Sequence, residues 1–259
     1  MKNDTVLRAI GDIDDKFIER AAPKNKTAGR KTAQWLKWAL PVAACFVIAV
    51  MIIIPLFNNS SDFNFILSSG VEVRYVNNTP NVQTSNSLIF LTEEELFAPE
   101  QLGMEIAVFE GKITRVNNIE LSFGSESHNK MYRAVAYIKV IEVFRGDVTV
   151  GDTVTVLLDA PIGIKNFWVE DTETSSQMTA GTIGIFMPAK YNENSTIQMN
   201  GNTLYLQEIA QYGLLDGVRY AFLEKSTGLV FARWAYESVA NATSMDEIRQ
   251  YVRTMLENK

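Results

Sequence analysis

Residues 131–158 read MYRAVAYIKVIEVFRGDVTVGDTVTVLL and decide the fold of the larger part of the chain. Apolar and polar residues alternate over Met131–Phe144, stop at a turn that contains Gly146, and alternate again over Asp152–Leu158. A period of two places successive side chains on opposite faces of an extended strand. The pattern therefore predicts two antiparallel strands joined by a tight turn.

Similar but shorter runs lie on both sides of this stretch. Such runs, separated by turn residues, are typical of antiparallel β structure. The polar stretch Asn77–Asn86, rich in Asn, Ser and Thr, is predicted to be a loop. The predicted strands are Phe63–Leu67, Val71–Val76, Leu88–Leu91, Glu105–Val116, Met131–Phe144, Asp152–Leu158, Thr182–Pro188, Ser195–Met199, Thr203–Gln207, Val218–Glu224 and Leu229–Tyr236.

Two segments are predicted to be helical. Thr92 is followed by three glutamates, which predicts a short helical turn, and residues 244–258 have Ser244 and Glu247 at capping-box spacing. Apolar side chains at helical spacing give this last helix one apolar face: Ile248, Tyr251, Val252, Met255 and Leu256. We expect the face to pack on the β domain, with a membrane or a partner surface as the alternative.

One uncharged apolar run, Trp38–Phe57, separates the two ends of the chain. Its twenty residues would span about 30 Å as a helix, which is the thickness of the hydrocarbon core of a bilayer. A buried helix of a soluble protein is usually shorter and shows a polar stripe. The run therefore predicts a single transmembrane helix.

Charges on either side of the run give its orientation. Residues 1–37 carry nine Lys and Arg against five Asp and Glu, whereas residues 58–259 carry fifteen against twenty-five. Because basic flanks stay in the cytosol, residues 58–259 are predicted to lie outside the plasma membrane. An acidic domain repels phosphates, which excludes nucleic acid as its partner. The orienting side chains are Lys24, Lys26, Arg30, Lys31 and Lys37.

Two processed forms are alternatives to a permanent anchor. A cleaved signal peptide would need a short basic start and small residues at its end, but 37 residues precede this run. A lipoprotein would be modified at Cys45, the one cysteine, which follows Val42, Ala43 and Ala44. Uncharged sequence continues well beyond Cys45, which favours the transmembrane interpretation.

The cytosolic segment contains a predicted amphipathic helix. Asp12 is suited to cap it, and Ile13, Phe17 and Ala21 recur at helical spacing. A helix of about ten residues is marginal in water, so its apolar stripe needs a partner protein or the lipid interface. The alternative is a tail that only sets the membrane topology.

This head of the chain resembles that of certain Gram-positive single-pass membrane proteins. The resemblance rests on Ile10-Gly11-Asp12-Ile13-Asp14-Asp15 with Ile18, followed by a basic stretch and one span. Many of those uncharacterised proteins are similar to membrane partners of extracytoplasmic-function sigma factors. The resemblance implies that a cytosolic regulator docks on the residues Asp12, Asp14, Asp15, Phe17 and Ile18.

A second resemblance covers residues 104–190. The turn Arg145-Gly146-Asp147, followed by Val150-Gly151-Asp152-Thr153, is similar to that of exported bacterial domains with an OB-like barrel. The resemblance implies an OB-like, antiparallel β-barrel in the outer domain. Barrels of this kind usually bind or scaffold, so the resemblance predicts a fold more than an activity.

Motifs for catalysis are weak in this chain. Ser127 and Lys130 have the spacing by which a lysine activates a serine nucleophile, but they lie in a predicted polar loop. His128 is the one histidine, which excludes zinc sites with several histidine ligands. The acidic residues Glu170, Asp171 and Glu173 lack the pattern of an EF-hand, which favours a solvated loop. We expect no cofactor and no enzyme, although a hydrolase with paired carboxylates stays open.

Aromatic residues suggest where a ligand would bind. Phe167 and Trp168 stand beside the acidic loop and are the predicted ligand groove, where a sugar or a peptide would stack. The sequence thus predicts a membrane-anchored sensing or binding domain that regulates a cytosolic partner such as a sigma factor. A passive cell-surface binding or assembly domain is the alternative.

Overall fold

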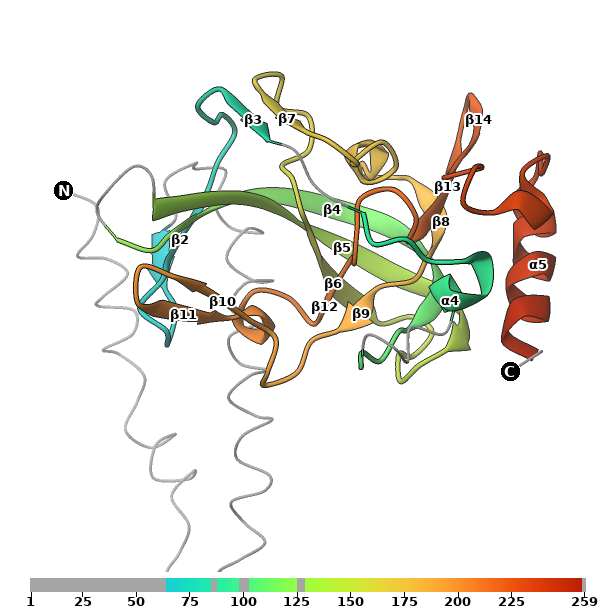
Figure 1. The fold of residues 1–259 in the computed structure, drawn as a ribbon, viewed down its shortest axis with the longest axis horizontal. Coiled ribbons are helices and arrows are strands. Elements are labelled where there is room, and N and C mark those ends of the chain that lie inside the picture. Colours follow the sequence, from blue (N-terminus) through green and yellow to red (C-terminus); the bar gives the residue numbers. More distant parts are fainter. Residues whose placement is uncertain (1–63, 85–87, 98–102, 125–128, 258–259) are drawn as a thin grey trace, which may run out of the picture. The chain divides into compact units, whose positions relative to one another are not determined.

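The computed structural model describes residues 64–84, 88–97, 103–124 and 129–257, and most of its elements are strands (Figure 1). The described strands are β1 (Asn64–Ile66), β2 (Glu72–Tyr75), β3 (Val82–Thr84), β4 (Val108–Ser122), β5 (Lys130–Arg145), β6 (Thr153–Leu158), β7 (Phe167–Val169), β8 (Ile183–Phe186), β9 (Ala189–Lys190), β10 (Thr196–Met199), β11 (Asn202–Tyr205), β12 (Tyr212–Gly213), β13 (Ala221–Lys225) and β14 (Gly228–Val230). The described helices are α4 (Glu93–Phe97), α5 (Met245–Glu257) and the 3-10 turns η3 (Ser175–Gln177), η4 (Leu206–Glu208) and η5 (Glu237–Val239).

A curled half-barrel sheet is the main element of this domain (Figure 1). Its long strands β4 and β5 pair antiparallel, and β6 pairs with β5 on the other side. Between β5 and β6 the chain turns at Gly146, whose φ of +105° suits glycine and where an added Cβ would stand 2.9 Å from that of Ala107. The predicted strand, turn and strand over residues 131–158 are therefore confirmed.

The paired strands of the sheet follow one another in an order that starts at β4 and returns to the residues just before β4. β12 joins β6 in parallel, with Tyr212 opposite Val156, and β9 pairs antiparallel with β12. Ile106, two residues before β4, then bridges Ala189 of β9. The neighbours are thus β4, β5, β6, β12, β9 and again the start of β4. Along its other edge, away from β5, β4 also pairs with β8 and with β2.

Both faces of the central strands are buried. Alternate residues of β5, among them Ala136 and Ile138, belong to the main hydrophobic core. The residues between them, among them Val135 and Tyr137, belong to a second core with side chains from β2, β11 and the turn after η4. Both faces of β5 are therefore covered by other parts of the domain, which explains why this strand is so rich in apolar residues.

The predicted C-terminal helix is confirmed as α5. The Ser244 hydroxyl donates to the Glu247 carboxylate (2.8 Å) and accepts from the Glu247 amide (3.4 Å), as in a capping box. Ile248, Tyr251 and Val252 are buried in the main core. The helix therefore packs on the β domain, as the sequence predicts.

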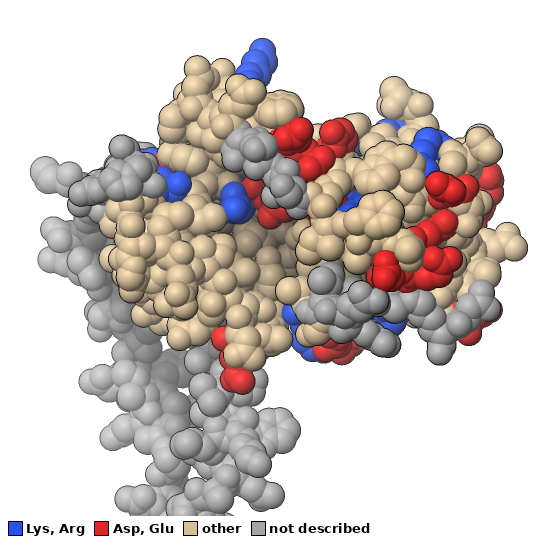
Figure 2. Space-filling model, in the orientation of Figure 1, with Lys and Arg blue, Asp and Glu red and all other residues tan. Residues whose placement is uncertain are grey.

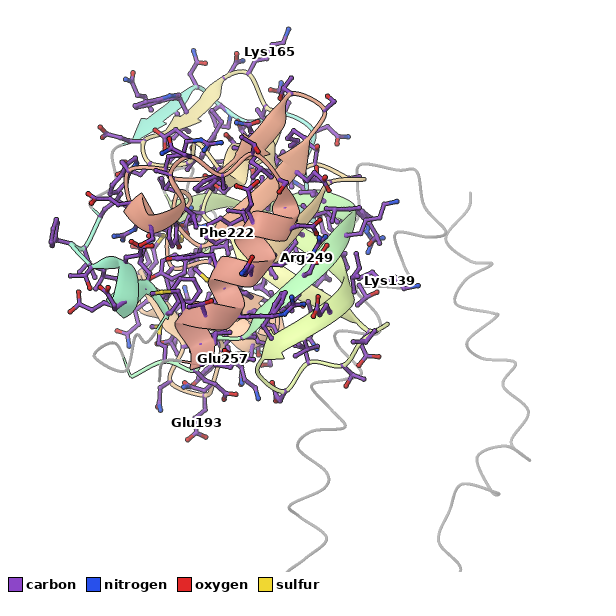
Figure 3. All side chains as sticks on the ribbon, turned by 90° about the vertical axis from the view of Figure 1, so that its right-hand side faces the viewer. Lys139, Lys165, Glu193, Phe222, Arg249 and Glu257 are labelled. Atoms are coloured by element: carbon purple, nitrogen blue, oxygen red, sulfur yellow. The ribbon has the colours of Figure 1, made fainter. Side chains whose placement is uncertain are left out.

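An ion pair joins α5 to the sheet. Arg249 donates through Nε and Nη2 to the two carboxylate oxygens of Glu110 on β4, at 2.6 and 2.7 Å. The Glu110 side chain is 5% exposed, and the bidentate contact supplies its carboxylate with two charge-assisted hydrogen bonds in place of water. Figure 3 looks onto α5 and labels Arg249 on the helix.

Several predicted strands are wrong in extent or in kind. Leu88–Leu91 is irregular and leads into α4, whose start is fixed by hydrogen bonds between Thr92 and Glu95. The run Leu229–Tyr236 is extended only to Val230, because Phe231 and Tyr236 fold back into the main core. In the predicted loop Asn77–Asn86, residues 82–84 form β3, because a distant strand, β7, pairs with them.

The strand predicted at Glu105–Val116 extends further, as β4, to Ser122. Asn117 and Asn118 follow the predicted end of this strand. The strand nevertheless continues through them to Ile119 and Leu121, which are buried in the second core. Burial of these apolar residues outweighs the low strand preference of asparagine.

The predicted span Trp38–Phe57 and the cytosolic segment 1–37 lie outside the described residues. Within the ranges that the structure describes, none of the helices has the length and apolar character needed to cross a bilayer.

Candidate functional site

A hollow of about 400 Å³ lies beside β7, in the segment that joins β6 to β8. All of its lining residues fall between Ala160 and Ser176. Phe167 and Trp168, which the sequence predicts as a ligand groove, both line it. A continuous stretch of chain thus curls around a space large enough for part of a ligand.

One wall of the hollow is fixed by Asn118 of β4. Its side-chain amide donates to the Ile162 carbonyl (2.9 Å) and accepts from the Ile162 amide (2.7 Å). This pair of hydrogen bonds imitates a strand bridge and holds the loop between Ala160 and Ile164 against the sheet. The wall is therefore attached to the central hairpin.

Phe167 is placed by a group of polar side chains on the sheet, which we call the Glu120 cluster: Arg74, Glu120, Lys130 and Tyr132. The ring of Phe167 lies edge-on to Tyr132, with the ring centroids 5.8 Å apart. Tyr132 in turn donates to Glu120 (2.9 Å), which also accepts from Arg74 and Lys130, both at 2.9 Å. The cluster therefore anchors the aromatic floor of the hollow to β2, β4 and β5.

Charge in the cluster depends on the ionised state of Glu120. Burial alone would raise the pKa of this carboxyl, but hydrogen bonds from Lys130, Tyr132 and Arg74 lower it below its ordinary value of 4.5. Burial and the Glu120 carboxylate raise the pKa of Tyr132 to about 12, so the phenol stays a donor at neutral pH. The carboxylate is thus the group whose titration matters in acid.

Replacing Glu120 by glutamine is expected to remove part of the pH dependence of stability. A lowered pKa in the folded state stabilises the fold above the unfolded pKa, and this contribution is lost as the pH falls through the folded pKa. Wild type should therefore exceed Glu120→Gln in unfolding free energy at neutral pH, and the gap should narrow as the pH falls below 4.5. Urea unfolding across this range measures the gap.

The control for this experiment is Glu72→Gln, which removes an exposed carboxylate from the neighbouring strand β2. A gap between wild type and Glu120→Gln that stays the same at every pH would contradict the assignment.

The other wall of the hollow is tied to the chain before β13. The amides of Thr174 and Ser175 donate to the Gly217 carbonyl at 3.2 and 2.7 Å, and the Thr174 hydroxyl donates to Val218 (2.8 Å). Gly217 fits because a Cβ there would stand 2.6 Å from the Asp171 carbonyl oxygen. Both walls are therefore held by contacts outside the segment itself.

Trp168 is the most exposed aromatic side chain of the hollow, with 54% of its surface accessible. Acidic side chains gather near the end of β7 (Figure 2), where the chain carries Glu170, Asp171 and Glu173. At the other end of the hollow Lys165 stands at the tip of its loop (Figure 3). The site thus combines a flat apolar surface with opposite charges at its two ends.

Other predicted motifs have structural roles or lie outside the description. Arg145 donates to the Phe97 carbonyl (2.6 Å) and Asp147 contacts Lys190 and accepts from Tyr212, so the Arg-Gly-Asp turn serves the fold. Outside the described residues lie Asp12, Asp14, Asp15, Phe17, Ile18, Lys24, Lys26, Arg30, Lys31, Lys37, Ser127 and His128.

No three His, Cys, Asp or Glu side chains lie close enough to hold a metal ion in the part of the chain that the structure describes. Glu170, Asp171 and Glu173, for which the sequence favours a solvated loop over a calcium site, are among these described residues.

Sequence reasoning missed the residues that build the walls. Asn118 and Glu120 interrupt an alternating strand with polar side chains, and both are partnered by residues far away in the sequence. A polar residue inside an apolar alternation is a usable signal, because its burial requires a partner.

Comparison of the chain with known protein families, curated proteins and solved structures gives no match.

Proposed function

We propose that this chain is a single-pass plasma-membrane protein whose outer domain binds a ligand, without catalysing a reaction, in the hollow beside Trp168. The observation that carries the proposal is a half-exposed tryptophan on a hollow whose two walls are fixed from outside. Binding favours such preformed sites, because little conformational entropy is lost when the ligand enters.

An OB-like barrel is the fold that we propose for the central strands. The pairing order β4, β5, β6, β12, β9 supports it, with β6 and β12 parallel and β9 returning to the start of β4. OB-folds commonly bind ligands on the face of their second and third strands. On β5 and β6 the side chains of that face, among them Tyr137 and Leu157, are buried in the second core. This burial favours a ligand site elsewhere, in the segment between the third and fourth barrel strands.

The membrane anchor is proposed from the apolar run Trp38–Phe57 and its basic flank. The inner segment with Asp12, Phe17 and Ile18 would then connect ligand binding to a cytosolic regulator such as a sigma factor. A pull-down with residues 1–37 that recovers no specific partner would count against this connection and would favour a passive surface domain.

Intact cells that carry the full-length chain provide the test of location and binding together. Two membrane-impermeant fluorescent probes are used, a pool of random heptapeptides and soluble peptidoglycan fragments. We expect cells with the wild-type chain to retain at least one probe. Trp168→Ala should reduce the retention by about ten-fold or more, since exposed aromatic residues at binding sites often contribute this much.

The matched control is Trp234→Ala, which removes another exposed tryptophan, 62% accessible, away from the hollow. This variant should retain the probe as wild type does. Equal retention by wild type and Trp168→Ala, at equal surface levels, would contradict the proposed site. Retention of neither probe by wild type would count against both location and binding.

A further inference from the structure

Among the described strands, β7 pairs with β3 alone, in a two-stranded sheet, and therefore along one edge. Val82 lies opposite Phe167 in parallel register, and its amide donates to the Asn166 carbonyl (3.0 Å). In a parallel ladder with this register, Trp168 turns its N–H and C=O toward β3. Phe167 and Val169 therefore turn their main-chain groups toward the opposite edge.

Four main-chain groups of Phe167 and Val169 face that opposite edge. Two of them form hydrogen bonds and two do not. The Phe167 amide donates to the Ile164 carbonyl (3.3 Å), and the Val169 carbonyl accepts from the Thr172 hydroxyl (2.8 Å). The Phe167 carbonyl and the Val169 amide have no hydrogen-bond partner among residues 64–84, 88–97, 103–124 and 129–257. One free acceptor and one free donor, two residues apart, are what an added strand needs.

The hollow lies along this open edge. Ile164 and Thr172, which close the two ends of the edge, both line the hollow, as do all three residues of β7. Val82 and Gln83 of β3 do not line it. The space is therefore on the side of β7 away from its one strand partner, where a third strand would add.

Charge around the hollow indicates what such a strand carries. Glu170 and Glu173 are exposed at the end of β7, with half-buried Asp171 between them, whereas Lys165 stands at the beginning. The net negative charge at one end attracts a Lys or Arg side chain. Trp168, on the same short strand, offers its face to an apolar or cationic neighbour.

We propose that the hollow takes an extended polypeptide segment, which adds to β7 as a third strand and carries a basic side chain toward Glu173. The proposal rests on the hollow being the binding site, as proposed above, and names its ligand class. Peptide addition to an exposed strand edge draws affinity from main-chain hydrogen bonds and specificity from alternate side chains. A glycan would use the tryptophan face and could meet these groups with its hydroxyls, but an extended chain presents its own N–H and C=O at the matching spacing.

The test uses the full-length chain in detergent micelles and a phage-displayed library of random heptapeptides. Peptides are kept only if Trp168→Ala abolishes their enrichment and Trp234→Ala does not. Each kept peptide is then synthesised with one backbone nitrogen methylated at a time. We expect methylation to weaken binding about ten-fold or more at the residue whose N–H meets the Phe167 carbonyl, and to leave its direct neighbours unaffected. Glu173→Gln should weaken the binding of peptides with Lys or Arg, while Glu142→Gln, on a distant strand, should not.

Three results would overturn the proposal. Kept peptides whose binding is insensitive to methylation at every nitrogen would exclude main-chain pairing. Binding of peptide-free glycan strands of peptidoglycan in a Trp168-dependent manner, with no peptide enriched, would overturn the ligand class and leave the proposed binding site standing. Binding of neither probe would overturn both. Because the methyl groups are placed on the ligand, main-chain pairing itself is measured with the wild-type chain, and a variant of β7 is used only to select the peptides.

Discussion

Replacing Arg249 by alanine is expected to lower the free energy of unfolding by about 3–5 kcal/mol, because removal of one partner leaves a buried charge without compensation. Glu110 is 5% exposed and receives two charge-assisted hydrogen bonds from Arg249. Without the guanidinium, the buried carboxylate on β4 loses the two donors that compensate for its desolvation. Urea unfolding of the full-length chain, followed by near-ultraviolet circular dichroism, measures the loss.

The matched control is on the same helix. Arg253 forms an ion pair with Glu142 of β5 at 2.6 Å, but both side chains are more than a third exposed. Arg253→Ala should therefore cost less than about 1 kcal/mol. An equal loss of unfolding free energy in Arg249→Ala and Arg253→Ala would contradict this prediction, because burial would then not decide how much each ion pair contributes. Replacing Glu110 and Arg249 together by methionine should recover most of the loss.

Replacing Phe222 by alanine is the second change with a large expected effect, about 3–5 kcal/mol of unfolding free energy. Its ring is fully buried in the main core, with centroid distances of 5.3 Å to Phe231 and 4.7 Å to Tyr236. Figure 3 labels Phe222 behind α5. Truncation removes apolar contact and leaves a cavity that these rigid neighbouring rings fill only in part.

Phe90→Ala serves as the control for Phe222→Ala, since Phe90 is 91% exposed. It should change the unfolding free energy by less than about 0.5 kcal/mol. Thermal or urea unfolding of both variants in parallel gives the comparison. A loss below about 1 kcal/mol for Phe222→Ala would mean that the core collapses into the space and that the aromatic cluster is not a fixed support.

Local patterns predict much of the described fold. The alternation in Met131–Phe144 and Asp152–Leu158 predicts β5 and β6, and the capping box at Ser244 predicts the start of α5. Each of these signals lies within a few residues of the element that it predicts. Strands of two or three residues, such as β9, β12 and β3, are missed because so short a run contains no period to read.

The candidate site is predictable only in part. Phe167 and Trp168 are conspicuous because aromatic residues stand beside an acidic stretch, and both line the hollow. Asn118 and Glu120, which hold them in place, show in the sequence only as polar residues within a strand. Their partners are not visible there, because the sheet brings them near. The role of a side chain that contacts a residue far away in the sequence can be recognised only when that contact is known.

The sequence by itself determined the long strands of the central hairpin and the C-terminal helix, because side-chain periodicity is a local property of the chain. It also placed one apolar, positively flanked run ahead of an acidic domain. Only the tertiary structure decided that Glu110 is buried against Arg249 and that β7 keeps one open edge. These features depend on which distant segments pair, and pairing is set by packing of the whole sheet, where the energy of each contact depends on the others.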